Sequence, residues 1–437
     1  MTGHPRRAAA FAAIATLTLA APSLGPATAV PFAAIGLIAV FGVREGRLFD
    51  LLARPADYEA GRLEGLAGFS LAIAALAILA TAPQLSMPEP VFVAAVFVVA
   101  FGALGTEMTS RAGASHARSV VAFVGIGTAA AAAGHLLVGY LVGAHSGAAS
   151  VVFLGTVGSI AAAILRELLY ERDDPIVLLS VGLLLWGASL LDAPLAMTYL
   201  LVAVAVTALL GYVSYALGTA SVAGALTGVL LGLVTIVYGG FGWFVVLISF
   251  YGLGALASKY RYDEKAARGV AEENLGARGT GNVLGNSAVA LVAVLGFAIA
   301  DGLSVPAVVF VLAFAGALST ALADTLSSEI GGLFDTPRLI TTLEPVDPGT
   351  DGAITWQGTL AGIAGAAIVG GLSAVLLPLS APLLGAVVIA IGGVAGTTAD
   401  SLFGATIEGN RLGNQTVNFL ATVVGAIVAV SVGIVLI

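Results

Sequence analysis

The sequence predicts an all-α fold, a polytopic bundle of transmembrane helices, and three observations support this prediction. Of the 437 residues, 59% are hydrophobic and only 10% are charged. Soluble domains carry about 25% charged residues, so the composition excludes an ordinary soluble domain. Apolar runs of helical length recur along the whole chain, whereas a membrane β-barrel would show short alternating segments. Finally, the basic residues fall in every second gap between these runs.

Apolar runs that approach the roughly 20 residues of a spanning helix give about fifteen candidate spans. In chain order they cover residues 8–24, 27–43, 66–82, 91–105, 120–143, 148–165, 176–191, 195–217, 221–238, 242–257, 282–300, 305–323, 353–376, 383–400 and 416–436. The first run follows Arg6 and Arg7 and precedes Ala27-Thr28-Ala29, as in a signal peptide. Because many further spans follow, we expect this segment to be a retained signal anchor.

The basic residues predict the orientation of the chain. The 17 basic residues are Arg6, Arg7, Arg44, Arg47, Arg54, Arg62, Arg111, Arg118, Arg166, Arg172, Lys259, Arg261, Lys265, Arg268, Arg278, Arg338 and Arg411. The positive-inside rule makes the gaps that hold them cytoplasmic. We therefore expect a multi-pass protein of the cell membrane, with a cytoplasmic N-terminus and, after fifteen spans, an external C-terminus.

Composition also bounds the chemistry and the partners. The chain has no Cys, which excludes disulfides, thiolate metal sites and Cys nucleophiles. No basic face indicates a nucleic acid partner, so the lipid bilayer is the expected one. The 57 Gly residues are explained first by close helix packing in lipid.

We expect two parts, residues 1–194 and residues 195–437, and the second contains an internal repeat. Three predicted spans end in similar segments, namely ALASK at 255–259, ALADT at 321–325 and TTADS at 397–401. Each is preceded by a helix of small residues, so the C-terminal part is predicted to consist of repeated helical hairpins. Repeats in multi-span proteins often place the functional site at their interface.

Carboxylates gather where two of these repeated spans end. Asp324 is followed by Glu329, and Asp400 is followed by Glu408. Ionisable groups beside membrane spans are costly and indicate function, although capping or snorkelling at the interface is a structural alternative. Mg²⁺ uses one or two carboxylates and completes its octahedron with water and phosphate oxygens. We therefore predict Asp324 and Asp400 as Mg²⁺ ligands, with Glu329 and Glu408 as supporting catalytic residues.

Further polar residues in the same predicted gaps favour phosphate binding. Glycines before a helix start expose backbone N–H groups and a positive dipole end, which bind anions. A flexible connector or ordinary helix capping would explain the same residues. The candidates for binding substrate or phosphate are Lys259, Arg278, Gly279, Gly281, Asn282, Asn286, Asp351, Asn414 and Asn418.

Four segments together resemble a known family. They are GTGNVLGN at 279–286, ADTLSSEIG at 323–331, PGTDGAI at 348–354 and GTTADSLFGA at 396–405. In their order and joint presence, residues from about 200 to 437 resemble the domain of unknown function 92 family of integral membrane proteins, which includes the transmembrane protein 19 group and plant phytyl-phosphate kinase. The resemblance does not cover the N-terminal part.

The resemblance implies a kinase that uses CTP or ATP to phosphorylate a prenyl phosphate at the cytoplasmic face. The implied partners are a nucleotide, a prenyl-chain lipid and Mg²⁺. Three alternatives stay open: a prenol kinase, a transporter or lipid flippase without kinase activity, and a non-catalytic assembly protein. The oligomeric state is not determined by the sequence.

Overall fold

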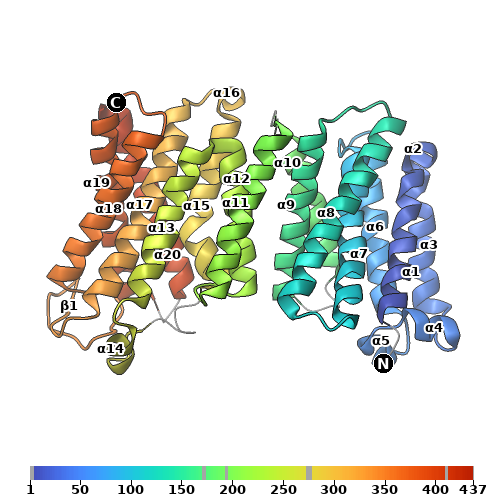
Figure 1. Cartoon of the computed structure of the whole chain (residues 1–437), viewed down its shortest axis with the longest axis horizontal. Coiled ribbons are helices and arrows are strands. Elements are labelled where there is room, and N and C mark those ends of the chain that lie inside the picture. The colour runs from blue at the N-terminus through green and yellow to red at the C-terminus, as the bar shows by residue number, and fades with distance from the viewer. Residues whose placement is uncertain (1–3, 170–173, 192–194, 272–277, 409–411, 437) are drawn as a thin grey trace. The chain divides into compact units, whose positions relative to one another are not determined.

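The chain folds almost entirely into helices. The computed structural model describes residues 4–169, 174–191, 195–271, 278–408 and 412–436. Among these, thirteen helices are long and apolar enough to cross a membrane, which confirms the predicted polytopic all-α bundle (Figure 1). The strands found in the described residues are β1 (Arg338–Leu339) and β2 (Ala353–Ile354), which pair antiparallel.

The structure differs from the predicted fifteen spans at two places. The first two predicted spans form one apolar stretch, Pro5–Phe41. Its helical backbone is interrupted at Gly25, where φ is +52°, and Figure 1 shows α2 at the opposite end from the N-terminus and α4. The other difference is α10 (Asp174–Ser189), whose 16 residues rise only about 24 Å, less than the hydrocarbon thickness of about 30 Å.

Two compact units make up the chain, an N-terminal unit (Met1–Leu201) and a C-terminal unit (Val202–Ile437). The boundary predicted after residue 194 falls at 192–194, outside the described residues. The N-terminal unit contains α1 (His4–Thr16), η1 (Leu17–Ala20), α2 (Ala21–Leu24), η2 (Gly25–Thr28), α3 (Ala29–Phe41), α4 (Arg47–Leu52), α5 (Pro55–Ala60), α6 (Glu64–Thr81), α7 (Glu89–Arg111), α8 (His116–Leu141), α9 (Ala148–Leu168) and α10.

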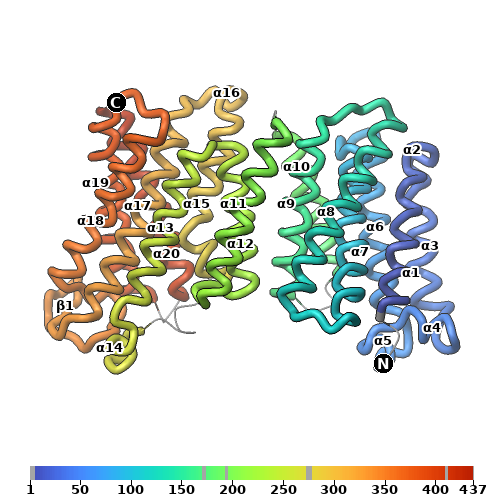
Figure 2. The backbone as a smooth tube through the Cα atoms, in the orientation of Figure 1, coloured from blue at the N-terminus to red at the C-terminus, as the bar shows by residue number. Residues whose placement is uncertain are grey.

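The C-terminal unit consists of successive helical hairpins followed by a last helix. After α11 (Met197–Ala216), which crosses the unit boundary, its helices are α12 (Val222–Gly239), α13 (Phe241–Lys259), α14 (Tyr262–Ala267), α15 (Thr280–Ala298), α16 (Ala300–Leu303), α17 (Ala307–Gly331), α18 (Trp356–Leu376), α19 (Pro382–Thr406) and α20 (Asn414–Leu436). The hairpins α12–α13, α15–α17 and α18–α19 can be followed in Figure 2.

Small residues let the central helices of the C-terminal unit approach closely. Three glycines meet where these helices cross: Gly316 of α17, Gly392 of α19 and Gly425 of α20. A Cβ atom added to any of them would contact the backbone of a neighbouring helix. Without a hydrophobic driving force between helices in lipid, such close packing is a main source of association. The abundance of glycine therefore has the structural explanation expected from the sequence.

The helices alternate in direction, and the two longest connections of the C-terminal unit, those that carry α14 and β1, lie at the same end. In the C-terminal unit Figure 1 shows α14 and β1 at one end, with α16 and the C-terminus at the other. The end with α14 and β1 also holds the C-terminal ends of α13, α17 and α19 and the N-terminal ends of α15, α18 and α20. Of the 17 basic residues, Arg172 and Arg411 lie outside the described residues.

Candidate functional site

A large polar cavity lies at the α14 and β1 end of the C-terminal unit. We call it the polar cavity; its volume is about 570 Å³. It is lined by ten of the predicted site residues: Arg278, Asn282, Asn286, Asp324, Glu329, Asp351, Asp400, Glu408, Asn414 and Asn418. The structure therefore brings together residues that are up to 140 positions apart in the chain, from Arg278 to Asn418.

Asp324 and Asp400 meet because the parallel helices α17 and α19 pack through a glycine. Gly396 lies against Thr320, with no room for a side chain. One turn further along each helix, Asp400 is within hydrogen-bonding contact of Asp324. Two carboxyl groups this close repel each other when ionised, so the pair favours a cation or a shared proton.

The carboxyl pair suits a hard cation with an open coordination sphere. Within the described ranges, no group of three or more His, Asp and Glu side chains has metal-binding geometry. Mg²⁺ commonly uses one or two carboxylates and takes its other ligands from water and phosphate oxygens, and the pair of Asp324 and Asp400 matches this number. The donor set fits the magnesium site predicted from the sequence, whose occupancy stays a prediction.

Two asparagines of α20 complete this side of the polar cavity. With its amide oriented to satisfy both neighbours, Asn418 donates to Asp400 Oδ1 at 3.3 Å and to Asn414 Oδ1 at 3.0 Å. The one-turn spacing of Asn414 and Asn418 places both on the same helix face, as predicted. Asn418 can therefore orient the Asp400 carboxylate.

Glu408 lies beyond the end of α19, beside two further carboxylates. Burial raises the pKa of Glu408, and the charges of Asp351 and Asp400 raise it further. Asp351 reaches this position because Gly352, with φ of +73°, lies directly against the Ser401 carbonyl and Ala405 of α19. A side chain at residue 352 would separate the turn from the helix.

Glu329 is held by a lysine whose role the sequence did not reveal. Lys265 is 1% exposed and forms an ion pair with Glu329, which is 6% exposed. Its Nζ also donates to the carbonyls of Ala257 (2.9 Å) and Ser258 (2.8 Å) at the end of α13. Lys265 thus caps α13 and fixes Glu329 of α17. Because one of its oxygens is engaged by Lys265, Glu329 joins α14 to α17 in the wall of the polar cavity.

Arg278 is buried at the edge of the polar cavity. Its backbone N–H donates to the Thr219 carbonyl at 3.0 Å, and its carbonyl accepts from Ser221 N–H at 3.2 Å. The guanidinium group lies over the Phe250 ring, 5.1 Å from the centroid, and against Gly254. Arg278 is 6% exposed, and its Nε and Nη1 have no hydrogen-bond partner in the described part of the chain.

Three of the predicted residues do not line the polar cavity. Lys259 instead lines a second cavity and is exposed. Gly281 lies against the Gln415 side chain, so its small size serves the packing of α15 on α20. Gly279 has open space around it and, at φ of −88°, needs no left-handed conformation. The two asparagines of α15 do line the cavity, with Asn286 Nδ2 donating to the Asn282 carbonyl at 3.0 Å.

The second cavity, which we call the apolar cavity, has a volume of about 520 Å³. Side chains of α11, α12 and α13 form most of its wall, among them Leu210, Phe244 and Leu247. Leu217 and Leu256, which also line it, are 66% and 69% exposed. Arg278 lines both cavities and therefore places a cation where the apolar cavity meets the polar one.

Comparison with known proteins relates the C-terminal unit to other membrane proteins. Residues 205–426 match the family described as "Integral membrane protein DUF92". An uncharacterized membrane protein of Methanocaldococcus jannaschii is 38% identical over 208 residues, which cover 46% of this chain and 80% of that protein. An uncharacterized membrane protein of Synechocystis sp. is 33% identical, covering 45% of this chain and 77% of that protein.

A plant protein is also similar over the same extent. Protein VTE6, chloroplastic, of Arabidopsis thaliana is 31% identical over 215 residues, which cover 48% of this chain and 64% of that protein. No solved structure matches the chain. The family match extends over half of the chain, and the archaeal relative is covered for four-fifths of its length. The chain therefore belongs to the integral membrane protein DUF92 family.

Proposed function

We propose that this chain is an integral membrane kinase that transfers a phosphoryl group from CTP or ATP to a prenyl phosphate, giving the diphosphate. The observation that carries the proposal is Arg278, whose buried guanidinium lines both cavities and has unpartnered Nε and Nη1 atoms among the described residues. A buried cation without a partner is costly. An anionic group bound between the two cavities would supply the missing charge.

A prenyl phosphate has the two parts that such a junction requires. Its hydrocarbon chain fits the chemistry of the apolar cavity, and its phosphate would accept hydrogen bonds from Arg278. The nucleotide triphosphate would occupy the polar cavity, beside Asp324 and Asp400. Both cavities, at about 520 and 570 Å³, fall in the range of small-molecule sites, roughly 300–1,000 Å³.

The reaction needs little covalent chemistry from the protein. An oxygen of the prenyl phosphate attacks the γ-phosphorus of the nucleotide, forming a new P–O bond. The bond between the γ-phosphorus and the β–γ bridging oxygen breaks, and the nucleoside diphosphate leaves with that electron pair. Because the acceptor phosphate already carries a nucleophilic oxygen, positioning and charge neutralisation supply most of the catalysis.

The polar residues divide this work between binding and positioning. Asp324 and Asp400 would hold Mg²⁺, which neutralises charge on the β- and γ-phosphates when bound. Asn418 orients Asp400, and Lys265 keeps Glu329 in place. Asn282, Asn286 and Asn414 present further polar groups to the same space, while Glu408 and Asp351 form its acidic rim.

The comparisons support the proposal at the level of the family. The segments that resemble the family include residues 279–286, which directly follow Arg278, and they contain Asp324 and Asp400. The resembling family includes plant phytyl-phosphate kinase. The match to the plant relative spans under two thirds of that protein, so the activity of this chain rests on the site geometry and on the assay below.

Phosphoryl transfer can be tested with the purified full chain in proteoliposomes. Nucleoside triphosphate carrying a γ-phosphate label is supplied as CTP or ATP, with phytyl phosphate, geranylgeranyl phosphate or the free prenols as acceptors. We expect labelled prenyl diphosphate. Asp324→Asn and Asp400→Asn should each lower kcat at least about 100-fold, beyond the 10–100-fold typical of outer-shell residues around a metal.

The matched control is Asp301→Asn, which removes an exposed carboxylate at the other end of the C-terminal unit. It should leave activity unchanged. Full activity in both Asp324→Asn and Asp400→Asn would overturn the metal assignment. Label on prenols only would identify a prenol kinase, and prenyl-lipid flux without nucleotide turnover would identify a flippase.

A further inference from the structure

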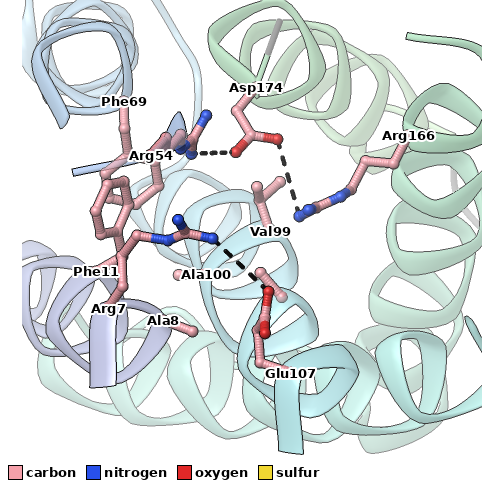
Figure 3. Close-up of a pocket in the computed structure, with 11 residues that line it drawn as sticks. Arg7, Ala8, Phe11, Arg54, Phe69, Val99, Ala100, Glu107, Arg166 and Asp174 are labelled. Carbon is pink, nitrogen blue, oxygen red and sulfur yellow. Dashed lines mark hydrogen bonds and ion pairs between the residues drawn. The ribbon is translucent and has the colours of Figure 1, made fainter. Parts of the chain in front are cut away.

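The N-terminal unit contains a small cavity of its own, which the kinase proposal does not use. It lies among α1, α6, α7, α9 and α10, beside the end of α4, and it has a volume of about 40 Å³. Figure 3 shows three arginines and two carboxylates around it: Arg7, Arg54, Arg166, Glu107 and Asp174. We call it the arginine cavity. Apolar residues, including Phe11, Phe69 and Val99, form the rest of its wall.

Among the described residues that line the arginine cavity, cationic side chains outnumber anionic ones. Arg54 Nη2 donates to Asp174 Oδ2 at 2.5 Å. In contrast, Arg7 Nη2 lies 3.8 Å from Glu107 Oε1, and Arg166 Nη1 lies 3.8 Å from Asp174 Oδ1. Both separations are too long for hydrogen bonds. Of the described residues that line the cavity, three carry positive charge and two carry negative charge.

Arg7 Nη2 and Arg166 Nη1 face the same space, whereas Arg7 Nη1 donates to the Ala53 carbonyl at 3.4 Å. Figure 3 shows the two guanidinium groups pointing toward each other from opposite sides, with Asp174 and Glu107 closing the other two sides. Arg166 Nη1 is buried and has no hydrogen-bond partner in the described ranges of the chain. The nearby carboxylate of Asp57 is engaged elsewhere, because it accepts from the backbone N–H groups of Arg54 (2.8 Å) and Gly65 (3.0 Å).

The arginines are held in place by packing. The Arg54 guanidinium lies over the Phe11 ring at 5.4 Å, and that of Arg166 lies over the Phe123 ring at 5.3 Å. Arg7 and Arg54 are each 8% exposed. Arg7 and Arg166 each lie 3.8 Å from their nearest carboxylate oxygen, so these two pairs leave room for a further acceptor. The space between the guanidinium groups of Arg7 and Arg166 is therefore bordered by positive charge.

We propose that the arginine cavity binds one phosphate group, either inorganic phosphate or the phosphate of a lipid headgroup. Arg–phosphate hydrogen bonds are charge-assisted and often bidentate, and basic pockets between membrane helices recognise lipid headgroups. A volume of about 40 Å³ corresponds to roughly three water positions at 10–15 Å³ each. This space is on the scale of the terminal oxygens of one phosphate group and excludes a nucleoside. The proposal is independent of the kinase proposal, because every residue involved belongs to the N-terminal unit.

Binding can be measured on the full chain in two arms. In the first, labelled inorganic phosphate is titrated into protein in nanodiscs of phosphatidylcholine alone. In the second, the thermal midpoint is compared between those nanodiscs and nanodiscs that contain phosphatidic acid. We expect saturable binding or stabilisation in at least one arm, and Arg166→Gln should weaken it at least tenfold or abolish the stabilisation. Arg166→Lys, which keeps the charge but loses the planar fork, should retain part of it.

The control is Arg62→Gln, which removes an arginine whose side chain is 53% exposed and paired with Glu64. It should leave the binding unchanged. Because Arg166→Gln could disturb folding, the thermal midpoint in phosphatidylcholine alone is measured for every variant. Absence of binding and stabilisation in both arms, or equal effects of Arg62→Gln and Arg166→Gln, would overturn the proposal. The arginine cavity would then hold water within a structural ion-pair network.

Discussion

At the scale of single residues, the described side chains that line the polar cavity include five carboxylates and one cation, Arg278. Asp324 and Asp400 are in contact, and Asp351 and Asp400 both act on Glu408. Lys265 is engaged by Glu329 and by two carbonyls, while Arg278 lies at the far edge toward the apolar cavity. This excess of negative charge is typical of a site that is completed by a divalent cation.

Glu408 predicts the sign of the pH dependence of stability in the absence of a divalent cation. The pKa of Glu408 in the folded chain lies above its usual range, first because of burial and then because of the charges of Asp351 and Asp400. A carboxyl group with a raised folded pKa stabilises the fold below its unfolded pKa, and this stability is lost as pH rises through the folded pKa. We expect Glu408→Gln to match wild type near pH 4 and to have the higher thermal midpoint at neutral pH.

The measurement is thermal unfolding from pH 4 to pH 8 without divalent cation. Asp301→Asn is the control, because Asp301 is an exposed acid outside the polar cavity, and its curve should follow wild type throughout. A midpoint difference between Glu408→Gln and wild type that does not change with pH would contradict the interpretation.

At the scale of elements, glycines decide where the functional side chains lie. Gly396 against Thr320 sets the distance between α17 and α19, and Gly352 sets the turn before α18 against α19. Near Arg278, Gly224 of α12 faces the Arg278 carbonyl, and Gly254 of α13 faces its Nη2 atom. Arg278 is thus held between two helices that leave room for it only because these positions lack side chains.

The substitution Gly254→Ala should displace the Arg278 guanidinium, because the added methyl group would occupy its place. Under the kinase proposal, the KM for prenyl phosphate should rise several-fold while kcat changes less. Arg278→Gln should have the larger effect on KM. The readout is the labelled-nucleotide assay at varied acceptor concentration.

Gly371→Ala provides the matched control, since it adds the same methyl group inside α18, where nothing lies within 4 Å. Kinetic constants of this variant should equal those of wild type. Equal KM values for Gly254→Ala and Gly371→Ala would show that the position of Arg278 does not govern acceptor binding.

At the scale of the whole molecule, the sequence predicts the bundle and much of the polar cavity. Hydropathy locates the spans, and the direction of each span follows from their alternation, so Asp324, Asp400 and Asn418 are correctly expected at one end of the C-terminal unit. Helical spacing also places Asn414 and Asn418 on one face. These features depend on local periodicity, which the sequence contains directly.

Other features depend on packing between distant elements and could not be predicted. Lys265 lies in the short helix α14 among several charged neighbours, and nothing local in the sequence selects Glu329 as its partner. The sequence predicts Lys259 beside phosphate, whereas the structure places it at the end of α13, where it lines the apolar cavity. The apolar cavity itself arises from space left between α11, α12 and α13, which no single segment reveals.

The basic residues predict the sidedness of the membrane protein, which cysteine labelling can measure. Because the chain contains no Cys, single cysteines can be introduced without background. Thr341→Cys adds a thiol to an exposed loop beside β1, and Asp301→Cys adds one to exposed α16 at the opposite end. The positive-inside rule places the β1 end in the cytoplasm. A membrane-impermeant maleimide should therefore label Asp301→Cys in intact cells, and Thr341→Cys only after the membrane is permeabilised. The reverse pattern would place the polar cavity outside the cell, away from cytoplasmic nucleotides, and would remove the kinase proposal together with the predicted orientation.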